Sequence, residues 1–304
     1  MKDFFDSKVP ICTNVSQVKE LLNKYSDCNF CLYLAYKSEE DWDKSTSRVY
    51  MNKVSDKLIY LPINIEKEDY KSIEEVYVLS EATNQIVAIN QTQPHKSNKV
   101  LREWFKDQDI PQNVDSLVKD QNGKLQLFDL NGPAFVGWFK DEVAGFNNKQ
   151  IIVLGVGGVG EPIARKIILD NPEVMYLIDI VPKEELCKEL SEYGKVDYYS
   201  SLNQLQLNKE EIIFINCAGK EGVDETGAIE LLEEHDSKGN IFVDLRPHLN
   251  IDIVEKAKSL NWESYTGFGM NARTDYALLS KICEVSNIVP PSFDEFKKMV
   301  ADAS

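Results

Sequence analysis

A lysine at the end of a short motif is the residue whose type and setting point most directly to proton transfer. Lys96 closes the segment Asn90-Gln-Thr92-Gln-Pro-His-Lys, which follows the apolar run IVAI. At the end of a buried strand, desolvation would lower the pKa of its ammonium group. Such an amine can give a proton to a carbonyl oxygen as hydride arrives, or take one in reverse. The competing interpretation is a solvated surface lysine.

A glycine-rich loop could hold the phosphates of a dinucleotide. Residues 150–160, QIIVLGVGGVG, join an apolar run to a GxGxxG pattern. Its first glycine permits the tight turn, its second lets the backbone approach a pyrophosphate, and its third lets the next helix pack closely. The first amides of that helix would face the phosphates. A merely structural turn is the alternative. The predicted cofactor-binding residues of the loop are Gly155, Gly157, Gly158, Val159 and Gly160.

The residue near the end of the next apolar run indicates which dinucleotide binds. The run Val174–Ile180 contains Asp179, whose carboxylate would hydrogen-bond the adenosine ribose 2′-hydroxyl and repel a 2′-phosphate. The residues that follow, IVPKEE, contain no arginine to bind such a phosphate. The sequence therefore favours NAD(H) over NADP(H) as the cofactor.

Strands and helices alternate from about residue 145 onward. Alternation of this kind predicts a parallel, doubly wound sheet, whose ligands bind beyond the carboxyl ends of the strands. We expect strands at 151–154, 174–180, 196–199, 212–216 and 241–244, with helices at 161–170, 183–191, 224–234 and 252–259.

The earlier part of the chain predicts a second α/β lobe that has no phosphate loop. Its periodicity favours helices at 15–24 and 67–77 and strands at 30–36, 58–63 and 86–90. Because 113–123 are polar and lack periodicity, we expect a hinge at 120–145. The fold class is thus two-lobed α/β. A substrate-binding and catalytic domain spans 1–131, a Rossmann domain spans 132–274, and helices at 275–304 pack back on the first domain.

Charge and composition exclude several kinds of partner. The chain has 304 residues and a formal net charge of −16, with its acidic residues spread along it. Such a surface repels phosphate, which argues against nucleic acid and anionic membranes. No apolar run approaches the roughly 20 residues of a membrane span, and the polar amino terminus is no signal peptide. The six cysteines form no metal-like array. We expect a cytoplasmic protein without a metal, and a homodimer stays open.

Short motifs along nearly the whole chain resemble, in identity and order, those of the shikimate and quinate dehydrogenase family. The segment Asn90–Lys96 matches the family's N-V-T-x-P-H-K motif. The other similar segments are PICTNVS at 10–16 to P-I-x-H-S-x-S, DLNGPAF at 129–135 to N-T-D-G-x-G-F, NCAG at 216–219 to N-A-T-x, and GFGM at 267–270 to G-x-x-M.

The resemblance implies a two-lobed oxidoreductase in which Lys96 is the acid/base and an aspartate completes the catalytic pair. That aspartate's position holds Asn131, while Asp129 stands where the family has asparagine. Residues two apart on a strand point to the same face. We therefore hypothesise that Asp129 partners Lys96. In the alternative, the pair is lost and Lys96 acts alone or is idle.

The resemblance also implies the residues around substrate and cofactor. Arg246 stands in a segment that lacks the family's tyrosine, so it could bind a substrate carboxylate or form a salt bridge at the sheet edge. Thr274 replaces a glutamine of the family's pocket. The remaining substrate residues are Asn14, Ser16, Asn90 and Thr92, and the remaining cofactor residues are Asn216, Cys217, Ala218, Gly267 and Met270.

These departures leave the substrate open among shikimate, quinate and a related small carboxylate. Two alternative functions also stay open. One is an imine or one-carbon-folate oxidoreductase on the same frame, and the other is a non-catalytic NAD-binding sensor or scaffold.

Overall fold

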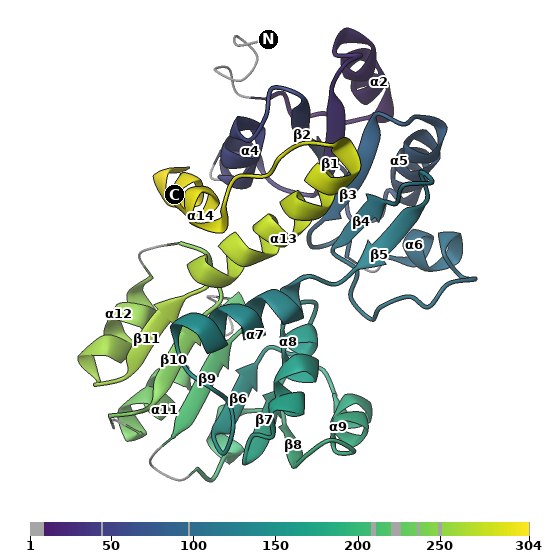
Figure 1. The fold of residues 1–304 in the computed structure, drawn as a ribbon. Coiled ribbons are helices and arrows are strands. Elements are labelled where there is room, and N and C mark those ends of the chain that lie inside the picture. Colours follow the sequence, from purple (N-terminus) through teal and green to yellow (C-terminus); the bar gives the residue numbers. More distant parts are fainter. Residues whose placement is uncertain are drawn as a thin grey trace. The chain divides into compact units, whose positions relative to one another are not determined.

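The computed structural model describes residues 9–43, 45–96, 98–207, 211–219, 226–235, 238–248 and 251–303. The chain divides into two compact units, each built on its own sheet (Figure 1). Unit 1 comprises Met1–Leu130 and Asp275–Ser304, and unit 2 comprises Asn131–Thr274.

Unit 1 contains a five-stranded mixed sheet in the order β2–β1–β3–β4–β5. Its three parallel strands are β1 (Asn29–Ala35), β2 (Leu58–Asn64) and β3 (Ile86–Gln91). The hairpin of β4 (Ser116–Lys119) and β5 (Leu125–Phe128) follows, with β4 antiparallel to β3. The start of β4 and the end of β5 therefore lie at the same sheet edge as the carboxyl ends of β1, β2 and β3.

The two faces of this sheet differ in character. On β1, Leu32 and Leu34 belong to the apolar core that the sheet forms with α2 (Val15–Lys24), α5 (Tyr70–Ala82) and α6 (Lys99–Trp104). Side chains alternate along a strand, so Cys31 and Tyr33 point to the opposite face, where Tyr33 stacks on Tyr60 at 5.3 Å. This second face carries polar groups.

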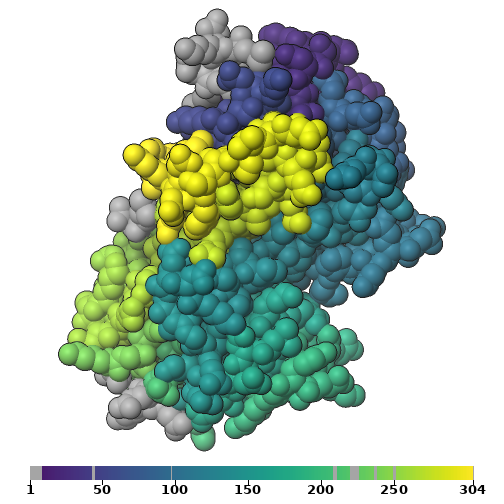
Figure 2. Space-filling model, in the orientation of Figure 1, coloured from purple at the N-terminus to yellow at the C-terminus, as the bar shows by residue number. Residues whose placement is uncertain are grey.

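Two short segments far apart in sequence meet in unit 1. The rings of Tyr50, at the end of α4 (Ser47–Tyr50), and Phe296, in α14 (Phe293–Ala303), lie 5.5 Å apart in an edge contact. The yellow surface of α14 lies beside the blue-purple surface of α4 in Figure 2. The last part of the chain is therefore an integral part of unit 1.

Unit 2 contains a six-stranded parallel sheet in the order β11–β10–β9–β6–β7–β8. The chain winds from β6 toward β8 in one direction and from β9 toward β11 in the other, so the order switches between β6 and β9. This confirms the doubly wound sheet. Its strands are β6 (Gln150–Leu154), β7 (Val174–Ile178), β8 (Val196–Tyr199), β9 (Ile212–Asn216), β10 (Ile241–Asp244) and β11 (Glu263–Thr266). Its helices are α7 (Asn131–Glu142), α8 (Gly160–Ile167), α9 (Glu184–Leu190), α11 (Ala228–Glu234), α12 (Asp252–Ser259) and the first turns of α13 (Phe268–Ser286). The expected start of α11 at 224 lies outside the described residues.

The boundary between the units, at Leu130 and Asn131, falls inside the range 120–145 where the hinge was expected, but this range is not a polar linker. β5 and α7 occupy most of that range, and the chain passes between the units at Leu130 and Asn131 with no long loop. The polar stretch is a tight hairpin turn, in which Asp120 accepts backbone hydrogen bonds and Gly123 adopts a φ of 77°. β4 was not predicted from the sequence because it is only four residues long and stands within this polar stretch.

Two other boundaries also differ. β7 ends at Ile178 rather than Ile180, which places Asp179 in the loop beyond the strand. The late helix α13 begins at Phe268 rather than near Asp275, so one helix carries residues of both units. None of the described helices is both long enough and apolar enough to cross a membrane.

Candidate functional site

Lys96 follows β3 in a loop that backbone hydrogen bonds hold at the carboxyl edge of the unit 1 sheet. The amide of Thr92 donates to the carbonyl of Leu34 in β1 at 3.1 Å, and the amide of His95 donates to the carbonyl of Thr92 at 2.8 Å. The fully buried His95 places its Nε2 2.9 Å from the carbonyl oxygen of Ile65, which follows β2. The loop is thus attached to two strands just before Lys96.

Burial and neighbouring carboxylates shift the pKa of Lys96 in opposite directions. Burial lowers the pKa of the Lys96 ammonium, whereas Asp115, Asp129 and Asp275 raise it, in decreasing order of strength. Within the described ranges, no carboxylate lies within 4.0 Å of its Nζ, so these groups act as neighbouring charges. A desolvated amine beside carboxylates can change its protonation state at moderate pH, which a proton-transfer group requires.

Asp115 is the carboxylate that strand order places nearest to β3. It precedes β4, the neighbour of β3, and its carbonyl accepts from the amide of Gln91 at 2.7 Å. Asp129 follows β5, one strand further away, so the two backbones stand about 5 and 10 Å from β3. The amide of Leu130 donates to Asp115 Oδ2 at 2.9 Å and fixes the carboxylate of this buried residue.

Residues 129–131 are not a strand, so the argument that Asp129 and Asn131 share one strand face is wrong. Asp129 lies in the loop after β5, in unit 1. Asn131 is the first residue of α7 and is buried within unit 2. Asp129 therefore joins the surroundings of Lys96, while Asn131 belongs to the other unit.

Asp275 adds a third carboxyl group, held on the polar face of unit 1 by α13. Tyr50 donates a hydrogen bond to its Oδ2. Burial raises the pKa of Asp275 from its ordinary value of 3.8 to about 6, against the hydrogen bond from Tyr50 and the charges of Lys37 and Lys96. A carboxyl group with this pKa changes its charge just below neutral pH.

We expect this carboxyl group to make stability depend on pH. Because its pKa is raised in the folded protein, its contribution is fully present below about 3.8 and is lost as pH rises through about 6. The stability advantage of the wild type over Asp275→Asn should therefore fall by roughly 3 kcal/mol across this window. Urea unfolding of both proteins at a series of pH values measures it, and a difference that is independent of pH would contradict the prediction.

Four of the predicted substrate residues occupy two places in unit 1, whereas Arg246 and Thr274 lie in unit 2. Asn90 and Thr92 lie at the end of β3 beside Lys96, and the amide of Asn90 donates to the hydroxyl of Tyr60 at 2.7 Å. Asn14 and Ser16 are exposed at the start of α2, where the Asn14 side chain accepts from the Gln17 amide as the helix N-cap.

A parallel bridge between Cys12 and Ile63 fixes the segment that leads to α2 on the outer side of β2. Three strand spacings, or about 14 Å, separate that side of β2 from β3. Asn14 and Ser16 follow this bridge at the start of α2, and their part in a substrate site stays a prediction.

The glycine loop of unit 2 follows β6 as predicted, and a different local constraint applies at each of its three motif glycines. Gly155 has a φ of 81°, and a Cβ there would meet Ala218 at 2.7 Å. A Cβ on Gly160 would stand 2.1 Å from the carbonyl oxygen of Gly155, so only glycine lets α8 begin here. A Cβ on Gly157 would meet no atom within 4 Å. The loop therefore has open space at Gly157, the position expected to approach a pyrophosphate.

Asp179 stands at the end of β7, beside this loop. Its carboxylate accepts from the amides of Val156 and Val181, at 2.7 and 2.8 Å. These bonds orient the carboxylate on the loop. The next side chain, Ile180, is 84% exposed, and Val181 is 57% exposed. An apolar flank next to a carboxylate suits an adenosine, whose ribose is polar and whose base is flat and apolar on its faces.

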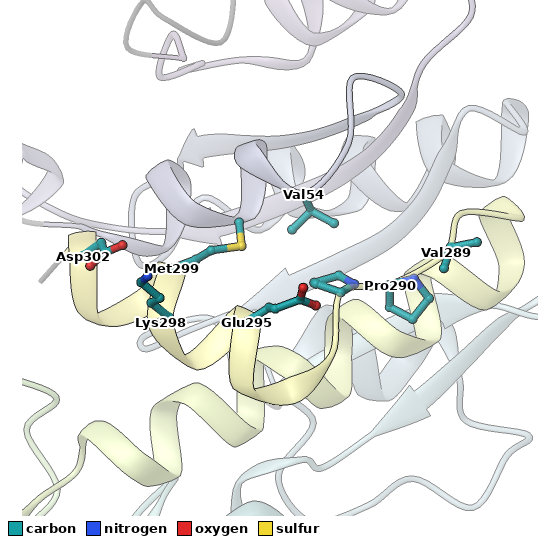
Figure 3. A pocket seen from close by; sticks show the side chains of 8 residues that line it. Val54, Val289, Pro290, Glu295, Lys298, Met299 and Asp302 are labelled. Atoms are coloured by element: carbon teal, nitrogen blue, oxygen red, sulfur yellow. The ribbon is translucent and has the colours of Figure 1, made fainter.

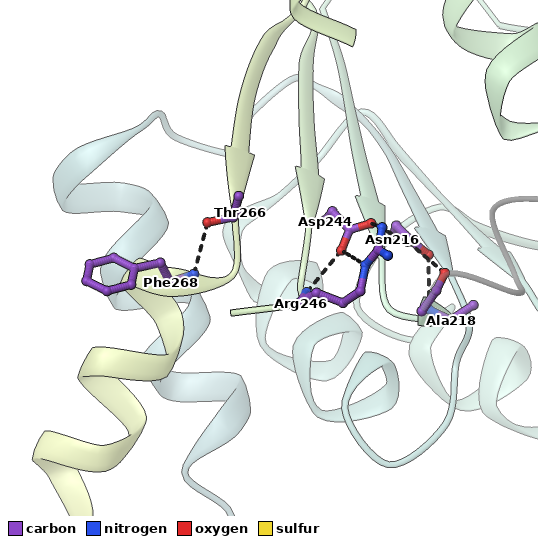
Figure 4. Close-up of polar contacts among 7 residues, drawn as sticks. Asn216, Ala218, Asp244, Arg246, Thr266 and Phe268 are labelled. Carbon is purple, nitrogen blue, oxygen red and sulfur yellow. Dashed lines mark hydrogen bonds and ion pairs between the residues drawn. The ribbon is translucent and has the colours of Figure 1, made fainter. Parts of the chain in front are cut away.

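A polar network joins the carboxyl ends of β9 and β10 (Figure 4). The amide of Asn216 donates to Asp244 at 2.8 Å, and its oxygen accepts from the amide of Ala218 at 3.1 Å. Both ends of the Arg246 guanidinium bind the buried Asp244 carboxylate, at 2.8 and 2.9 Å. Arg246 thus forms the salt bridge at the sheet edge. Burial raises the pKa of the Cys217 thiol, which disfavours a nucleophilic thiolate.

The start of α13 packs against the same sheet edge. Gly267 donates its amide to the carbonyl of Arg246 at 3.0 Å, and a Cβ there would meet the Leu245 carbonyl oxygen at 2.1 Å. Met270 is buried, and Thr274 donates its hydroxyl back to the Met270 carbonyl at 3.0 Å. The predicted cofactor residues thus gather at the carboxyl edge of the unit 2 sheet, on the switch-point side.

Four polar residues of the Lys96 surroundings were not predicted from the sequence. They are Lys37, Tyr50, Asp115 and Asp275, which the fold brings together on unit 1. Tyr50 and Asp275 are 225 positions apart, and no local pattern connects them. Asp115 stands just before SLVK, so recognition of that strand would have placed it at the sheet edge.

A separate hollow on unit 1 contains none of these residues. It measures about 470 Å³ and lies between the end of the short 3-10 helix η1 (Met51–Lys53) and the α13–α14 segment (Figure 3). Its lining residues are Val54, Val289, Pro290, Pro291, Glu295, Lys298, Met299 and Asp302.

Comparison with curated proteins finds similar sequences of one kind. No family model matches the sequence. Over 145 residues, 45% of this chain and 49% of the relative, it is 27% identical to shikimate dehydrogenase (NADP(+)) of Methanococcus vannielii. Over 197 residues, 61% of this chain and 68% of the relative, it is 26% identical to the protein of that name from Methanocaldococcus jannaschii. The chain spans about half the length of the curated relatives it matches first, 49% and 57%.

Solved structures of the same fold cover most of the chain. Shikimate 5-dehydrogenase from Listeria monocytogenes, in complex with shikimate and NAD, has a TM-score of 0.71 at 17% identity, over 89% of this chain and 96% of that one. Quinate dehydrogenase from Corynebacterium glutamicum, in complex with NAD, has a TM-score of 0.71 at 12% identity, over 91% and 99%. The ligand-free 5-ketofructose reductase of Gluconobacter sp. strain CHM43 has a TM-score of 0.66 at 15% identity, over 91% and 99%. In sequence the chain is similar to shikimate dehydrogenases, and in fold it is similar to shikimate and quinate dehydrogenases.

Proposed function

We propose that the chain is an NAD(H)-dependent oxidoreductase that moves a hydride between the nicotinamide and an alcohol or ketone carbon of a small carboxylate. The observation that carries the proposal is the desolvated Lys96 among three aspartates, on a chain whose other unit contains a glycine loop at the switch point of a parallel sheet. A lysine that only served as a solvated surface residue would not need to be desolvated or surrounded by carboxylates.

Lys96 supplies the proton chemistry. When bound, the cofactor accepts or donates the hydride. As a neutral amine, Lys96 takes the hydroxyl proton while the carbon–oxygen bond of the alcohol becomes a carbonyl. As an ammonium, it returns that proton to the oxygen in the reverse reaction. Asn90 and Thr92, at the end of the same strand, would orient the reacting hydroxyl.

The carboxylate that tunes Lys96 is the main departure from the family's pattern. The sequence points to Asp129, whose charge raises the pKa of Lys96. Asp115 has the greater influence and the nearer strand. We therefore assign the main partner role to Asp115 and a supporting one to Asp129. Asn131, in unit 2, carries no charge and takes no part in the proton step.

Residues of unit 2 would hold NAD. The amides of Gly157, Gly158 and Val159 would bind the pyrophosphate, and Asp179 the ribose hydroxyls. The remaining contacts of the nicotinamide side would come from Asn216, Cys217, Ala218, Gly267 and Met270. Asp179 and the exposed Ile180 and Val181 favour NAD over NADP, since none of the three can bind a 2′-phosphate. The curated relatives are called NADP(+) enzymes, so we expect a difference from them.

The substrate is the least determined part of the proposal. Shikimate, quinate and a related hydroxy acid fit the chemistry of Lys96 equally. A carbonyl substrate of another class also fits the frame, since a protein of this fold is a 5-ketofructose reductase. Reduction of an imine or oxidation of a folate-bound one-carbon unit would use the same lysine and cofactor.

Turnover by the purified full-length protein tests the proposal. Shikimate and quinate are each incubated with NAD⁺ or NADP⁺, and the absorbance of the reduced nicotinamide is followed. We expect kcat/KM with NAD⁺ to exceed that with NADP⁺ by at least about tenfold, the cost of one unfavourable charge contact of roughly 1.4 kcal/mol. Tight NAD binding with no turnover of these acids, of ketoses or of imino acids would instead support the non-catalytic sensor.

A further inference from the structure

Lys37 stands at the same sheet edge as Lys96 and has no assigned role. We propose that Lys37 binds the carboxylate of the substrate and so orients the substrate with its reacting hydroxyl toward Lys96. The inference rests on the proposed function, and it names the residue that would recognise the anionic part of its substrate.

The ammonium of Lys37 is held in a fixed position above two aromatic rings. Lys37 follows β1, and its Nζ lies 5.2 Å from the ring centroid of Tyr33 and 5.0 Å from that of Trp42. The two rings meet edge to face at 5.6 Å, and Trp42 is buried. Cation–π contacts of this kind orient an ammonium group but leave its N–H donors largely unused.

Hydrogen bonding uses only some of the N–H donors of the Lys37 ammonium group. The Nζ of Lys37 donates to the hydroxyl of Ser45 at 3.2 Å, and an ammonium has three donors. Across the described part of the chain, no carboxylate lies within 4.0 Å of it. Desolvation is the main cause that lowers the pKa of Lys37. A partly buried ammonium with donors to spare is a binding group for an anion.

A short chain of hydroxyl groups connects Lys37 with the loop of Lys96. Ser45, the partner of Lys37, and Thr92, in the Lys96 loop, both act on the pKa of the Tyr33 hydroxyl and oppose the rise that burial causes. Lys37 and Lys96 also both act on Asp275. The two lysines therefore both border one polar region, in which Tyr33, Tyr50 and Asp275 are buried and Thr92 is partly exposed. The proposal requires a small hydroxy acid, with its carboxylate and its reacting hydroxyl on one ring, to reach both ammonium groups.

The charges around Lys37 do not neutralise it fully. Asp41 and Asp275 raise its pKa, and Arg48 lowers it. Asp41 accepts from the hydroxyl of Ser38 at 2.7 Å, and Asp275 accepts from Tyr50. Both carboxyl groups therefore have donors of their own. Arg246, the residue that the sequence offers for a substrate carboxylate, is engaged with Asp244.

A carboxylate is favoured over a phosphate because the site offers one ammonium and one hydroxyl. Phosphate sites in proteins combine several cations or a series of backbone amides. The acidic neighbours Asp41 and Asp275 would repel a dianion more strongly than a monoanion. The site is therefore expected to select singly charged acids.

The test compares free acids with their uncharged methyl esters in the full-length protein. Shikimate and quinate, each with its methyl ester, are assayed for KM and kcat and titrated for Kd by calorimetry. Lys37→Met should raise KM and Kd of the free acids about 10- to 100-fold, the worth of one hydrogen bond to a charged group, with kcat changed less than about fivefold and the esters unaffected. Lys37→Arg, which keeps the charge, should restore most of the affinity.

Lys24→Met is the matched control, since Lys24 also lies over a tyrosine ring, 5.3 Å from Tyr25, at the far end of α2. It should change no constant. If Lys37→Met does not fold, Lys37→Gln replaces it with the same expected ratio. Turnover of the acids with the same KM in wild type and Lys37→Met overturns the inference but not the proposed function.

Binding without turnover contradicts the proposed function, and the ratio of Kd values for acid and ester then decides the role of Lys37 by itself. A wild type that binds neither acid, or binds acid and ester equally, overturns the inference.

Discussion

Replacing Lys96 with methionine is expected to lower kcat by about 10²- to 10⁴-fold, the usual contribution of a positioned acid/base group. Methionine keeps the length and apolar stem of lysine and removes only its proton-carrying amine. The Kd for NAD should stay within about twofold, since the change lies in unit 1 and the glycine loop in unit 2. Steady-state turnover and calorimetric titration with NAD measure the two effects.

The matched control for this change is Lys99→Met. Lys99 is the first residue of α6, three positions beyond Lys96, and its exposed ammonium lies 3.6 Å from the ring centroid of Tyr70. The control should retain wild-type turnover. A Lys96→Met protein that folds and turns over substrate at more than about a tenth of the wild-type rate would exclude Lys96 as the acid/base.

Asp115→Asn should shift the pH dependence of turnover to lower pH. The carboxylate of Asp115 raises the pKa of Lys96, so removing its charge lowers that pKa further. The acid limb of kcat/KM for alcohol oxidation, which requires the neutral amine, should move to lower pH. The plateau should also fall on the order of tenfold, because Lys96 becomes a weaker base. Asparagine keeps an oxygen for the Leu130 amide, so the loop should stay intact.

Asp129→Asn gives the comparison that ranks the two carboxylates. Its charge has the smaller influence on Lys96, and we expect a smaller shift of the same sign. If Asp129→Asn shifts the pH profile more than Asp115→Asn, the partner is Asp129, as the sequence indicates. Unchanged turnover and pH profile in both variants would show that Lys96 acts without a carboxylate.

The sequence predicted most of the unit 2 sheet but not β11 (Glu263–Thr266), and it predicted the glycine loop because this loop depends on local backbone geometry. Gly155 has a positive φ and Gly160 has no room for a Cβ, so both positions require glycine. This requirement appears in the sequence as glycines at a fixed spacing. Continuous apolar runs marked the buried parallel strands β6, β7, β9 and β10 equally well. The glycine loop and these four strands therefore lie close to where the sequence placed them, although β7 ends before Asp179.

The sequence was insufficient for unit 1, whose site forms from residues far apart. Asp115, Asp275 and Lys37 come from β4, α13 and the end of β1, and no spacing connects them. The motif located Lys96 but not its neighbours, because side-chain surroundings depend on strand order. Strand order in a mixed sheet follows from pairing between strands that are distant in sequence. The sequence of a short strand such as β4 does not indicate which strand it pairs with.

Unit 1 is discontinuous in the chain, and this sets an order on its synthesis. A ribosome completes Met1–Leu130 and then the whole of unit 2 before it delivers Asp275–Ser304. Until then Tyr50 lacks both Asp275 and the ring of Phe296, so an apolar and polar surface stays exposed on the nascent chain. Unit 2 is synthesised as one continuous stretch, whereas the surroundings of Lys96, which include Asp275, can form only after Asp275 has left the ribosome. Synthesis of unit 2 is therefore complete before unit 1 can reach its final fold.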